Sequence, residues 1–194
     1  MTIRIFDICR NGTRVLGPGN RYAIWVQGCE QNCYRCITPE SRPKNGGHEL
    51  DVDDLAADII INKNIDGITI SGGEPFLQPV ALCSLLDQVK KIRPQLTVII
   101  YTGLVYENLL KIPVCLNLIE KSDIIIDGQY VESLNDNKGI RGSSNQRINP
   151  ITNRLDNYIN IMESCNRKLQ RIADTNGLIT TIGIPDKKKY KIKI

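Results

Sequence analysis

The sequence predicts an α/β fold built on a parallel sheet, with a β-hairpin added near its C-terminal end. Short segments rich in β-branched residues alternate with segments of helical periodicity through the middle of the chain, which is typical of parallel sheets. The clustered cysteines follow the first of these strand-like segments, Ser71-Gly72-Gly73 the second, Thr102-Gly103 the third and Asp127-Gly128 the fourth. At the C-terminal end Asn176-Gly177 separates two further strand-like segments, and this dipeptide is a strong hairpin signal. The length of 194 residues favours one domain over residues 1–194.

Local patterns predict each element in order. A helix is expected over residues 51–62, because Asp51 suits an N-cap, two acidic residues follow it, and leucine and isoleucine recur at helical spacing. Another is expected over 79–91, with one apolar face and two lysines in its last turn. The other expected elements are strands at 23–26, 67–70, 97–101, 123–126, 168–173 and 178–183, and short helices at 106–110 and 114–119. The polar stretch from 128 to 150 is too long for an idle connection, so we expect a functional loop there.

The composition feature that limits function most is seven Cys against one His. One imidazole cannot supply a two-His iron site or an H-E-x-x-H zinc protease, so any metal chemistry must depend on sulfur. The first ten residues show no signal-peptide pattern, and no apolar segment approaches the roughly 20 residues of a membrane-spanning helix. Together with an odd number of cysteines, this favours reduced thiols and a cytoplasmic protein. The net charge of +4 is mild and part of it lies in the lysine-rich segment 187–193, so neither nucleic acid nor a membrane is expected as a partner.

Three of the cysteines, Cys29, Cys33 and Cys36, fall within one loop after the first expected strand. A cubane iron–sulfur cluster normally takes four thiolates, so three would leave one iron open to chelate a small molecule. The alternative is a structural zinc site completed by His48, which a loop could bring into reach. The spacing of these residues leaves both centres open. The other four cysteines are scattered and are expected to pack as small apolar side chains: Cys9, Cys83, Cys115 and Cys165.

A second motif, Gly72-Gly73-Glu74, follows the next expected strand. Adjacent glycines allow backbone groups to approach a ligand closely, and a neighbouring carboxylate can accept a hydrogen bond from an ammonium group. By itself the tripeptide is also typical of a tight turn. Because it lies one strand–helix unit after the cysteine loop, and ligands of parallel sheets bind at the carboxyl ends of the strands, the pair of motifs favours a single site.

The order Cys29-x3-Cys33-x2-Cys36 followed by Gly72-Gly73-Glu74 resembles the signature of the radical S-adenosylmethionine superfamily. Segment 123–134 and the string Arg-Gly-Ser-Ser-Asn-Gln-Arg at 141–147 are similar to the small activating enzymes of anaerobic ribonucleotide reductase. The resemblance covers about residues 20–150 and implies a partial, open (β/α) barrel of the radical SAM type. A C-terminal β extension at about 165–194 is an addition to that pattern, as are the lead-in at 12–20 and the loop at 39–47.

The resemblance also implies roles for individual residues. The three clustered cysteines would ligate a [4Fe-4S] cluster, and S-adenosylmethionine would chelate its fourth iron. Arg141 and Arg147 would neutralise the cofactor carboxylate, seat a partner, or stabilise the loop. The implied cofactor contacts are Tyr34, Arg35, Cys36 and Ile37 near the adenine, Gly72, Gly73 and Glu74 at the methionine ammonium, and Thr102, Asp127, Ser143 and Asn145 at the methionine or ribose.

The implied reaction is reductive cleavage of S-adenosylmethionine to methionine and a 5′-deoxyadenosyl radical, with electrons from flavodoxin or ferredoxin. That radical would abstract hydrogen from a glycine of a glycyl-radical enzyme such as anaerobic ribonucleotide reductase, and no catalytic side chain beyond the cluster and cofactor sites is required. Two alternatives remain at this point. One is a radical enzyme that modifies a peptide or small molecule, and the other is a binding module stabilised by zinc on three cysteines and His48.

Overall fold

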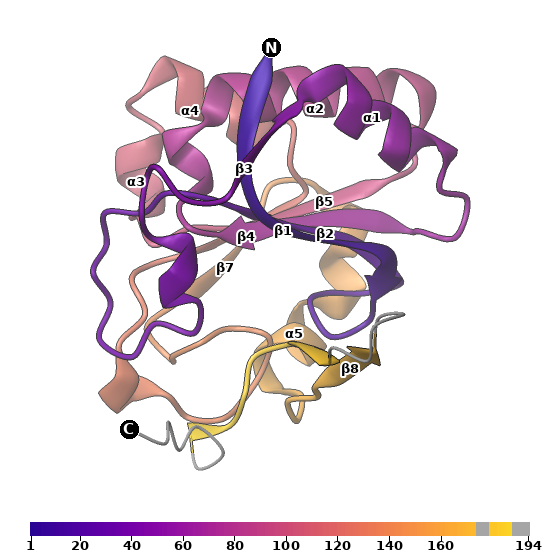
Figure 1. Ribbon diagram of the computed structural model, residues 1–194. Coiled ribbons are helices and arrows are strands. Elements are labelled where there is room, and N and C mark those ends of the chain that lie inside the picture. The colour runs from indigo at the N-terminus through magenta and orange to yellow at the C-terminus, as the bar shows by residue number, and fades with distance from the viewer. Residues whose placement is uncertain (174–178, 188–194) are drawn as a thin grey trace.

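A seven-stranded mixed sheet forms the centre of the computed structural model, which describes residues 1–173 and 179–187 (Figure 1). The strands lie in the order β3-β1-β2-β4-β5-β6-β7. The four central strands, β2, β4, β5 and β6, are parallel, whereas β1, β3 and β7 pair antiparallel at the two sides. The strand bounds are β1 Thr2–Thr13, β2 Arg21–Val26, β3 His48–Asp51, β4 Gly67–Gly72, β5 Thr97–Tyr101, β6 Ile124–Asp127 and β7 Arg147–Pro150.

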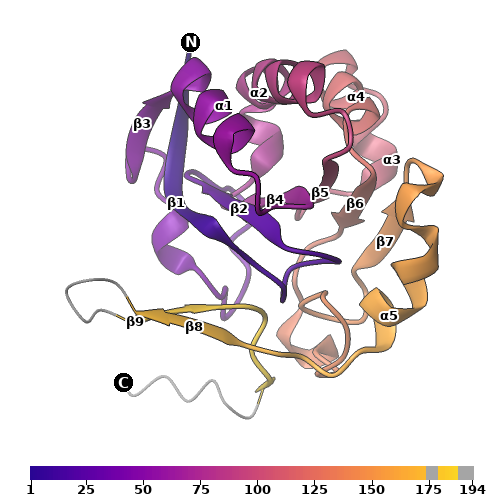
Figure 2. The same cartoon turned by 90° about the vertical axis from the view of Figure 1, so that its right-hand side faces the viewer.

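Helices α1, α2 and α4 form a layer over one face of the sheet (Figure 2). Asp51 caps α1 as expected, because its side chain accepts a hydrogen bond from the backbone N–H of Asp53 at 2.7 Å. Pro79 opens α2, where a missing N–H costs nothing. The helix bounds are α1 Val52–Ile61, α2 Pro79–Ile92, α3 Tyr106–Leu109, α4 Pro113–Glu120 and α5 Ile159–Ser164.

Alternation along the strands gives the sheet two different faces. On β2, Tyr22, Ile24 and Val26 pack into the core beneath the helices, whereas Ala23 and Trp25 belong to a separate cluster on the opposite face. The same alternation continues across the parallel strands, because their residues are in register with those of β2. One face therefore anchors the helical layer, and the other is free to form a site.

Arg21 closes the amino-terminal end of this second face. Its side chain is fully buried and its guanidinium donates to the hydroxyls of Thr69 (3.1 Å) and Thr97 (2.5 Å) and to the carbonyl of Ile68 (2.6 Å). Burial lowers the pKa of Arg21 to about 10, which still leaves it charged at neutral pH. A buried guanidinium, whose hydrogen bonds go to neutral hydroxyl and carbonyl oxygens, thus fills the amino-terminal end of this second face.

The C-terminal hairpin lies across the second face. Its strands are β8 Gln170–Ala173 and β9 Ile179–Ile182, and Ile182 packs with Leu16 and Ala23. The Gln170 side chain accepts a hydrogen bond from Thr13 Oγ1 at 2.9 Å and donates one to the carbonyl oxygen of Gly12 at 3.2 Å. The hairpin thus lies on the side of the sheet opposite the helical layer (Figure 2).

The structure confirms the predicted α/β class and the hairpin, and it corrects four omissions. Strand β1 and helix α5 were missed, β3 lies between the expected loop at 39–47 and the expected helix, and β7 lies in the stretch 128–150 that was expected to be a loop. Closure of the sheet into a partial barrel stays a prediction, and Asn176-Gly177 lies outside the described residues. Within the described part of the chain, no helix is long and apolar enough to cross a membrane.

Candidate functional site

A cavity of about 750 Å³ opens at the carboxyl ends of the parallel strands, between the sheet and the hairpin. Part of its wall comes from residues at or next to the carboxyl ends of β2, β4 and β5, namely Trp25, Ser71 and Tyr101. Predicted site residues that line the same cavity are Cys29, Cys33, Arg35, Cys36, Ile37, Gly72, Gly73, Glu74 and Thr102. The volume falls within the roughly 300–1,000 Å³ of small-molecule sites. The sequence motifs thus converge on one space of suitable size.

Backbone hydrogen bonds join the start of the cysteine loop, residues 28 and 29, to its later part, residues 41 and 42. The N–H of Gly28 donates to the carbonyl of Ser41 at 2.8 Å, and the N–H of Cys29 donates to that of Arg42 at 2.9 Å. The Gln27 amide donates to two carbonyls of the same stretch, those of Glu40 (3.1 Å) and Pro43 (2.6 Å). The extended loop at 39–47, an unusual feature of this sequence, therefore forms the outer support of the thiols.

All seven cysteines are free, and three of them face the cavity together. Burial raises the pKa of the Cys29 and Cys33 thiols, so both are protonated at neutral pH until a metal displaces the proton. Within residues 1–173 and 179–187, no three His, Cys, Asp or Glu side chains are gathered around one point as a single metal ion requires. A cubane binds each thiolate through a different iron, so thiols spread around one cavity fit that group.

His48 lies apart from the thiols. It pairs with Ile5 at the edge of the sheet, its side chain is exposed, and it does not line the cavity. The set of three cysteines and His48 that a zinc module would need is not brought together.

The two glycines of the second motif let β4 approach the cysteine loop. A Cβ on Gly72, where φ is +102°, would lie 2.6 Å from backbone atoms of Val26, and a Cβ on Gly73 would lie 2.2 Å from the carbonyl oxygen of Gly28. This closeness permits two backbone hydrogen bonds of 2.7 Å, from Gly73 N–H to Val26 and from Glu74 N–H to Gly28. The glycines therefore fix the position of the first cysteine as well as any ligand contact.

Gly73→Ala is expected to separate β4 from the cysteine loop, because the new methyl group would overlap the carbonyl oxygen of Gly28. We expect the free energy of unfolding to fall by roughly 2–4 kcal/mol, as for other overpacked or strained positions. Urea unfolding of the two proteins measures this change. Gly103→Ala is the control, because its Cβ would meet the side chain of Gln31 and no backbone atom. An equal loss in the two variants would contradict the close approach at Gly73.

Glu74 is buried and its carboxylate braces the neighbouring strand end. One oxygen accepts from Thr102 Oγ1 (2.8 Å) and from the backbone N–H of Phe76 (3.1 Å), and the other accepts from the N–H of Gly103 (2.9 Å). Burial raises the pKa of Glu74, although these three hydrogen bonds act in the opposite direction. Glu74 and Thr102 therefore form one unit that ties the end of β4 to the end of β5. Direct contact of either residue with a cofactor stays a prediction.

Asp127 lies outside the cavity lining and holds β7 and α3 instead. Its buried carboxylate accepts from the guanidinium of Arg147, from the N–H of Tyr106 (2.8 Å) and from Asn149 Nδ2 (3.0 Å). Burial alone would raise the pKa of Asp127, but these hydrogen bonds hold it below its usual range. Arg147 also binds Glu107 through two hydrogen bonds of 2.8 Å, which lower the pKa of Glu107 to about 2. These contacts indicate a structural role for Asp127 and Arg147.

Arg147→Met is therefore expected to remove an acid-sensitive part of the stability. Carboxylates with lowered folded-state pKa values stabilise the fold above their ordinary pKa of about 4, and this contribution is lost as the pH falls toward 2. At pH 7 the variant should lose about 2 kcal/mol, because buried Asp127 would keep its charge without a cation. Denaturant unfolding from pH 7 down to about 2 measures the difference, which should shrink with acidification. If the difference in the free energy of unfolding between the two proteins did not change with pH, the ion pairs of Arg147 would not be the source of the stability.

The other predicted contacts are divided between the cavity and its surroundings. Tyr34 is exposed and does not line the cavity. The guanidinium carbon of Arg35 lies over its ring, 5.7 Å from the ring centre. Buried Ser143 accepts from the N–H of Val131 at 3.1 Å, and exposed Asn145 donates to the carbonyl of Gln129 at 2.8 Å. Neither Ser143 nor Asn145 lines the cavity. Their contact with a cofactor stays a prediction that this geometry does not support.

Sequence reasoning missed a group of lining residues in the loop after β6. Gln146 is the central one, because its side-chain oxygen accepts from the N–H of Gly142 (2.7 Å) and its Nε2 donates to the carbonyl of Gly128 (2.8 Å). Tyr130 and Glu132 also line the cavity. The sequence could have indicated Gln146, since it belongs to the specific string at 141–147, but Ser143 and Asn145 were predicted from that string as the cofactor contacts.

Comparisons with known proteins agree with this geometry. Residues 15–149 match the model of the family described as "4Fe-4S single cluster domain". The chain is 30% identical over 138 residues to the anaerobic ribonucleoside-triphosphate reductase-activating protein of Enterobacteria phage T4, covering 69% of this chain and 86% of the phage protein. It is 31% identical over 144 residues to the protein of that name from Escherichia coli K12, covering 69% and 90% of the two chains. Similarity to the pyruvate formate-lyase-activating enzyme of Clostridium pasteurianum is 34% over 80 residues, which is 39% of this chain and 34% of that enzyme.

Proposed function

Because this chain belongs to the radical S-adenosylmethionine family of activating enzymes with a single 4Fe-4S cluster, we propose that it installs a glycyl radical on a partner enzyme such as an anaerobic ribonucleotide reductase. Its cofactors are a [4Fe-4S] cluster and S-adenosylmethionine. The observation that carries the proposal is the meeting of three thiols with Gly72 and Gly73 around one cavity. We further propose a cytoplasmic location and flavodoxin or ferredoxin as the reductant.

The chain's own residues bind and orient the reactants. Cys29, Cys33 and Cys36 would hold three irons, and the backbone of Gly72 and Gly73 would receive the ammonium of the cofactor. When bound, the reduced cluster and S-adenosylmethionine supply a 5′-deoxyadenosyl radical by one-electron cleavage. The apolar and aromatic part of the lining, which includes Trp25, would exclude water from the groups that pack against it.

The bound cofactor would supply the hydrogen-abstracting chemistry, so no side chain of the site would have to move a proton. Arg141 is engaged in the loop, where its Nη1 lies 3.4 Å from the carbonyl oxygen of Ser144 and 3.3 Å from that of Gln146. These contacts support a loop-stabilising role.

A second substrate class remains a candidate within the same chemistry, namely a peptide or a small molecule. The observation that favours it is the C-terminal hairpin, which the sequence resemblance does not include and which lines the cavity. The zinc-stabilised binding module receives no support, because His48 lies at the sheet edge.

Anaerobic reconstitution with iron and sulfide tests the proposal. The loaded protein should be brown and should form 5′-deoxyadenosine from S-adenosylmethionine and dithionite. Mixing it with an anaerobic ribonucleotide reductase from the same genome should produce the electron paramagnetic resonance signal of a glycyl radical. If the protein cleaves S-adenosylmethionine but no glycyl radical forms on the reductase, the result would favour a peptide or a small molecule as the substrate. No 5′-deoxyadenosine from fully loaded protein would overturn both.

A further inference from the structure

The C-terminal hairpin supplies a large part of the cavity wall, on the side opposite the sheet. The wall consists of Leu169, Arg171 and residues 180–187, and it lines the same cavity as Trp25 and the three clustered cysteines. Ile182 is 97% buried against the second sheet face, since only 3% of it is exposed. We name this segment, residues 167–173 and 179–187, the C-terminal wall. It is packed in place as part of the fold.

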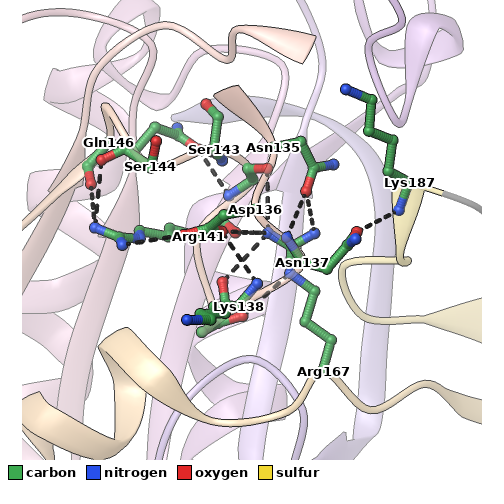
Figure 3. Close-up of polar contacts among 12 residues, drawn as sticks. Asn135, Asp136, Asn137, Lys138, Arg141, Ser143, Ser144, Gln146, Arg167 and Lys187 are labelled. Carbon is green, nitrogen blue, oxygen red and sulfur yellow. Dashed lines mark hydrogen bonds and ion pairs between the residues drawn. The ribbon is translucent and has the colours of Figure 1, made fainter. Parts of the chain in front are cut away.

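Arg167 anchors the C-terminal wall to the loop after β6. Its side chain is only 2% exposed, and its guanidinium donates to Asn135 Oδ1 (2.8 Å) and to the carbonyls of Arg141 (2.6 Å), Gly142 (3.2 Å) and Pro185 (3.1 Å) (Figure 3). One planar cation thus joins a loop on one side of the cavity to the segment that follows β9. The fork of a guanidinium can satisfy several carbonyls at once, which an ammonium cannot do in the same geometry.

Glu132 connects the same segment to the cysteine loop at the rim of the cavity. Its two oxygens lie 3.4 Å from Arg35 Nη1 and 3.7 Å from Lys187 Nζ. The backbone N–H of Lys187 also donates to Asn137 Oδ1 at 2.6 Å (Figure 3). Arg35 immediately precedes Cys36, so these ion pairs bridge the C-terminal wall and the loop that carries the thiols.

From this arrangement we propose that the C-terminal wall is a size-selecting element, which closes one side of the cavity and admits only slender groups to the three thiols. Arg167 and Glu132 are its positioning residues. The substrate that fits is a small molecule or an extended peptide segment, whereas a folded protein surface is held outside. The inference concerns access alone and holds whether or not the partner is a glycyl-radical enzyme.

Alkylation of the thiols in the full-length, metal-free chain tests this proposal. The small probe is N-ethylmaleimide, and the bulky probe is a biotin maleimide already bound to streptavidin, each normalised to its rate with glutathione. Trypsin releases residues 22–35, with Cys29 and Cys33, and residues 36–44, with Cys36, so mass spectrometry follows the sites separately. The quantity compared is the labelling rate of the bulky probe divided by that of the small probe. The degree of ionisation of each thiol does not affect this ratio, because both probes react with the same thiolate.

In the unaltered protein the bulky probe should label these three thiols at least tenfold more slowly than the small probe. Arg167→Lys keeps the charge but loses the fork, and the ratio should rise about tenfold, as expected for the loss of buried hydrogen bonds to a charged group. Glu132→Gln removes two partly exposed ion pairs, so the ratio should rise by only about 2- to 5-fold. High salt should produce a similar rise without any substitution, because it screens the same pairs.

Asp87→Asn is the matched control, since it removes an ion pair with Lys121 in the helical layer and leaves the wall intact. Circular dichroism verifies that each variant is folded. The proposal is overturned if the bulky probe labels the unaltered protein as fast as the small one. It is also overturned if folded Arg167→Lys and Glu132→Gln keep the ratio of the Asp87→Asn control. Neither result bears on whether the chain cleaves S-adenosylmethionine.

Discussion

Cys33→Ala is expected to leave the protein unable to retain a [4Fe-4S] cluster and to reduce formation of 5′-deoxyadenosine to background. Among residues 1–173 and 179–187, three thiols line the cavity, so the loss of one would leave two irons of the cluster without a protein ligand. Anaerobic reconstitution followed by iron and sulfide analysis and visible absorption measures the cluster. Chromatographic detection of 5′-deoxyadenosine measures cleavage.

Cys165→Ala is the matched control for this prediction. Cys165 is also a partly exposed thiol, but it follows α5 and does not line the cavity. The control should load iron and form product as the unaltered protein does. Retention of a full cluster by Cys33→Ala, or loss of the cluster in the control, would contradict the assignment of the ligands.

The second large effect concerns stability. Arg21→Met is expected to lower the free energy of unfolding by roughly 3 kcal/mol, because the buried carbonyl of Ile68 and the hydroxyls of Thr69 and Thr97 would lose their donor. Methionine restores most of the volume, so the loss reports on hydrogen bonds more than on a cavity. Urea unfolding at neutral pH provides the measurement.

Arg10→Met serves as the comparison, since Arg10 is exposed on β1 and pairs with Asp58 at the surface. It should cost less than about 1 kcal/mol. If Arg21→Met costs no more than Arg10→Met, the buried guanidinium does not support the closed end of the sheet.

The sequence predicted the central strands and helices because their apolar residues recur with a clear period. It did not predict β1, whose residues alternate Arg4, Asp7 and Arg10 with apolar side chains and whose pairing is interrupted by register shifts. Strand β3 was missed for a related reason, since His48 to Asp51 is polar and pairs only at the edge. Such strands are defined by their partners more than by their own composition.

The candidate site shows the same division. The sequence predicted that the three cysteines and the two glycines meet at one cavity, because both motifs follow neighbouring parallel strands, whereas their contact with a cofactor stays a prediction. The environments of Asp127 and Ser143 were not, since the partners of Asp127 come from β7 and α3 and Ser143 is turned toward Val131. A polar residue at the end of a strand can face a ligand or brace a neighbouring element, and only the tertiary contacts distinguish the two. The participation of residues 180–187 in the wall likewise depends on long-range packing.

The alternation of faces along β2 limits how chains of this kind can change in length. Inserting one residue at the start of Arg21–Val26 would exchange the side chains beneath the helices with those toward the cavity, and would place Tyr22 and Ile24 where Ala23 and Trp25 now lie. Insertions in the stretches 14–20 and 39–47 lie outside the strands of this sheet and leave their registers unchanged. New substrate preferences can therefore arise by growth of loops and of the C-terminal end while the parallel strands keep their length.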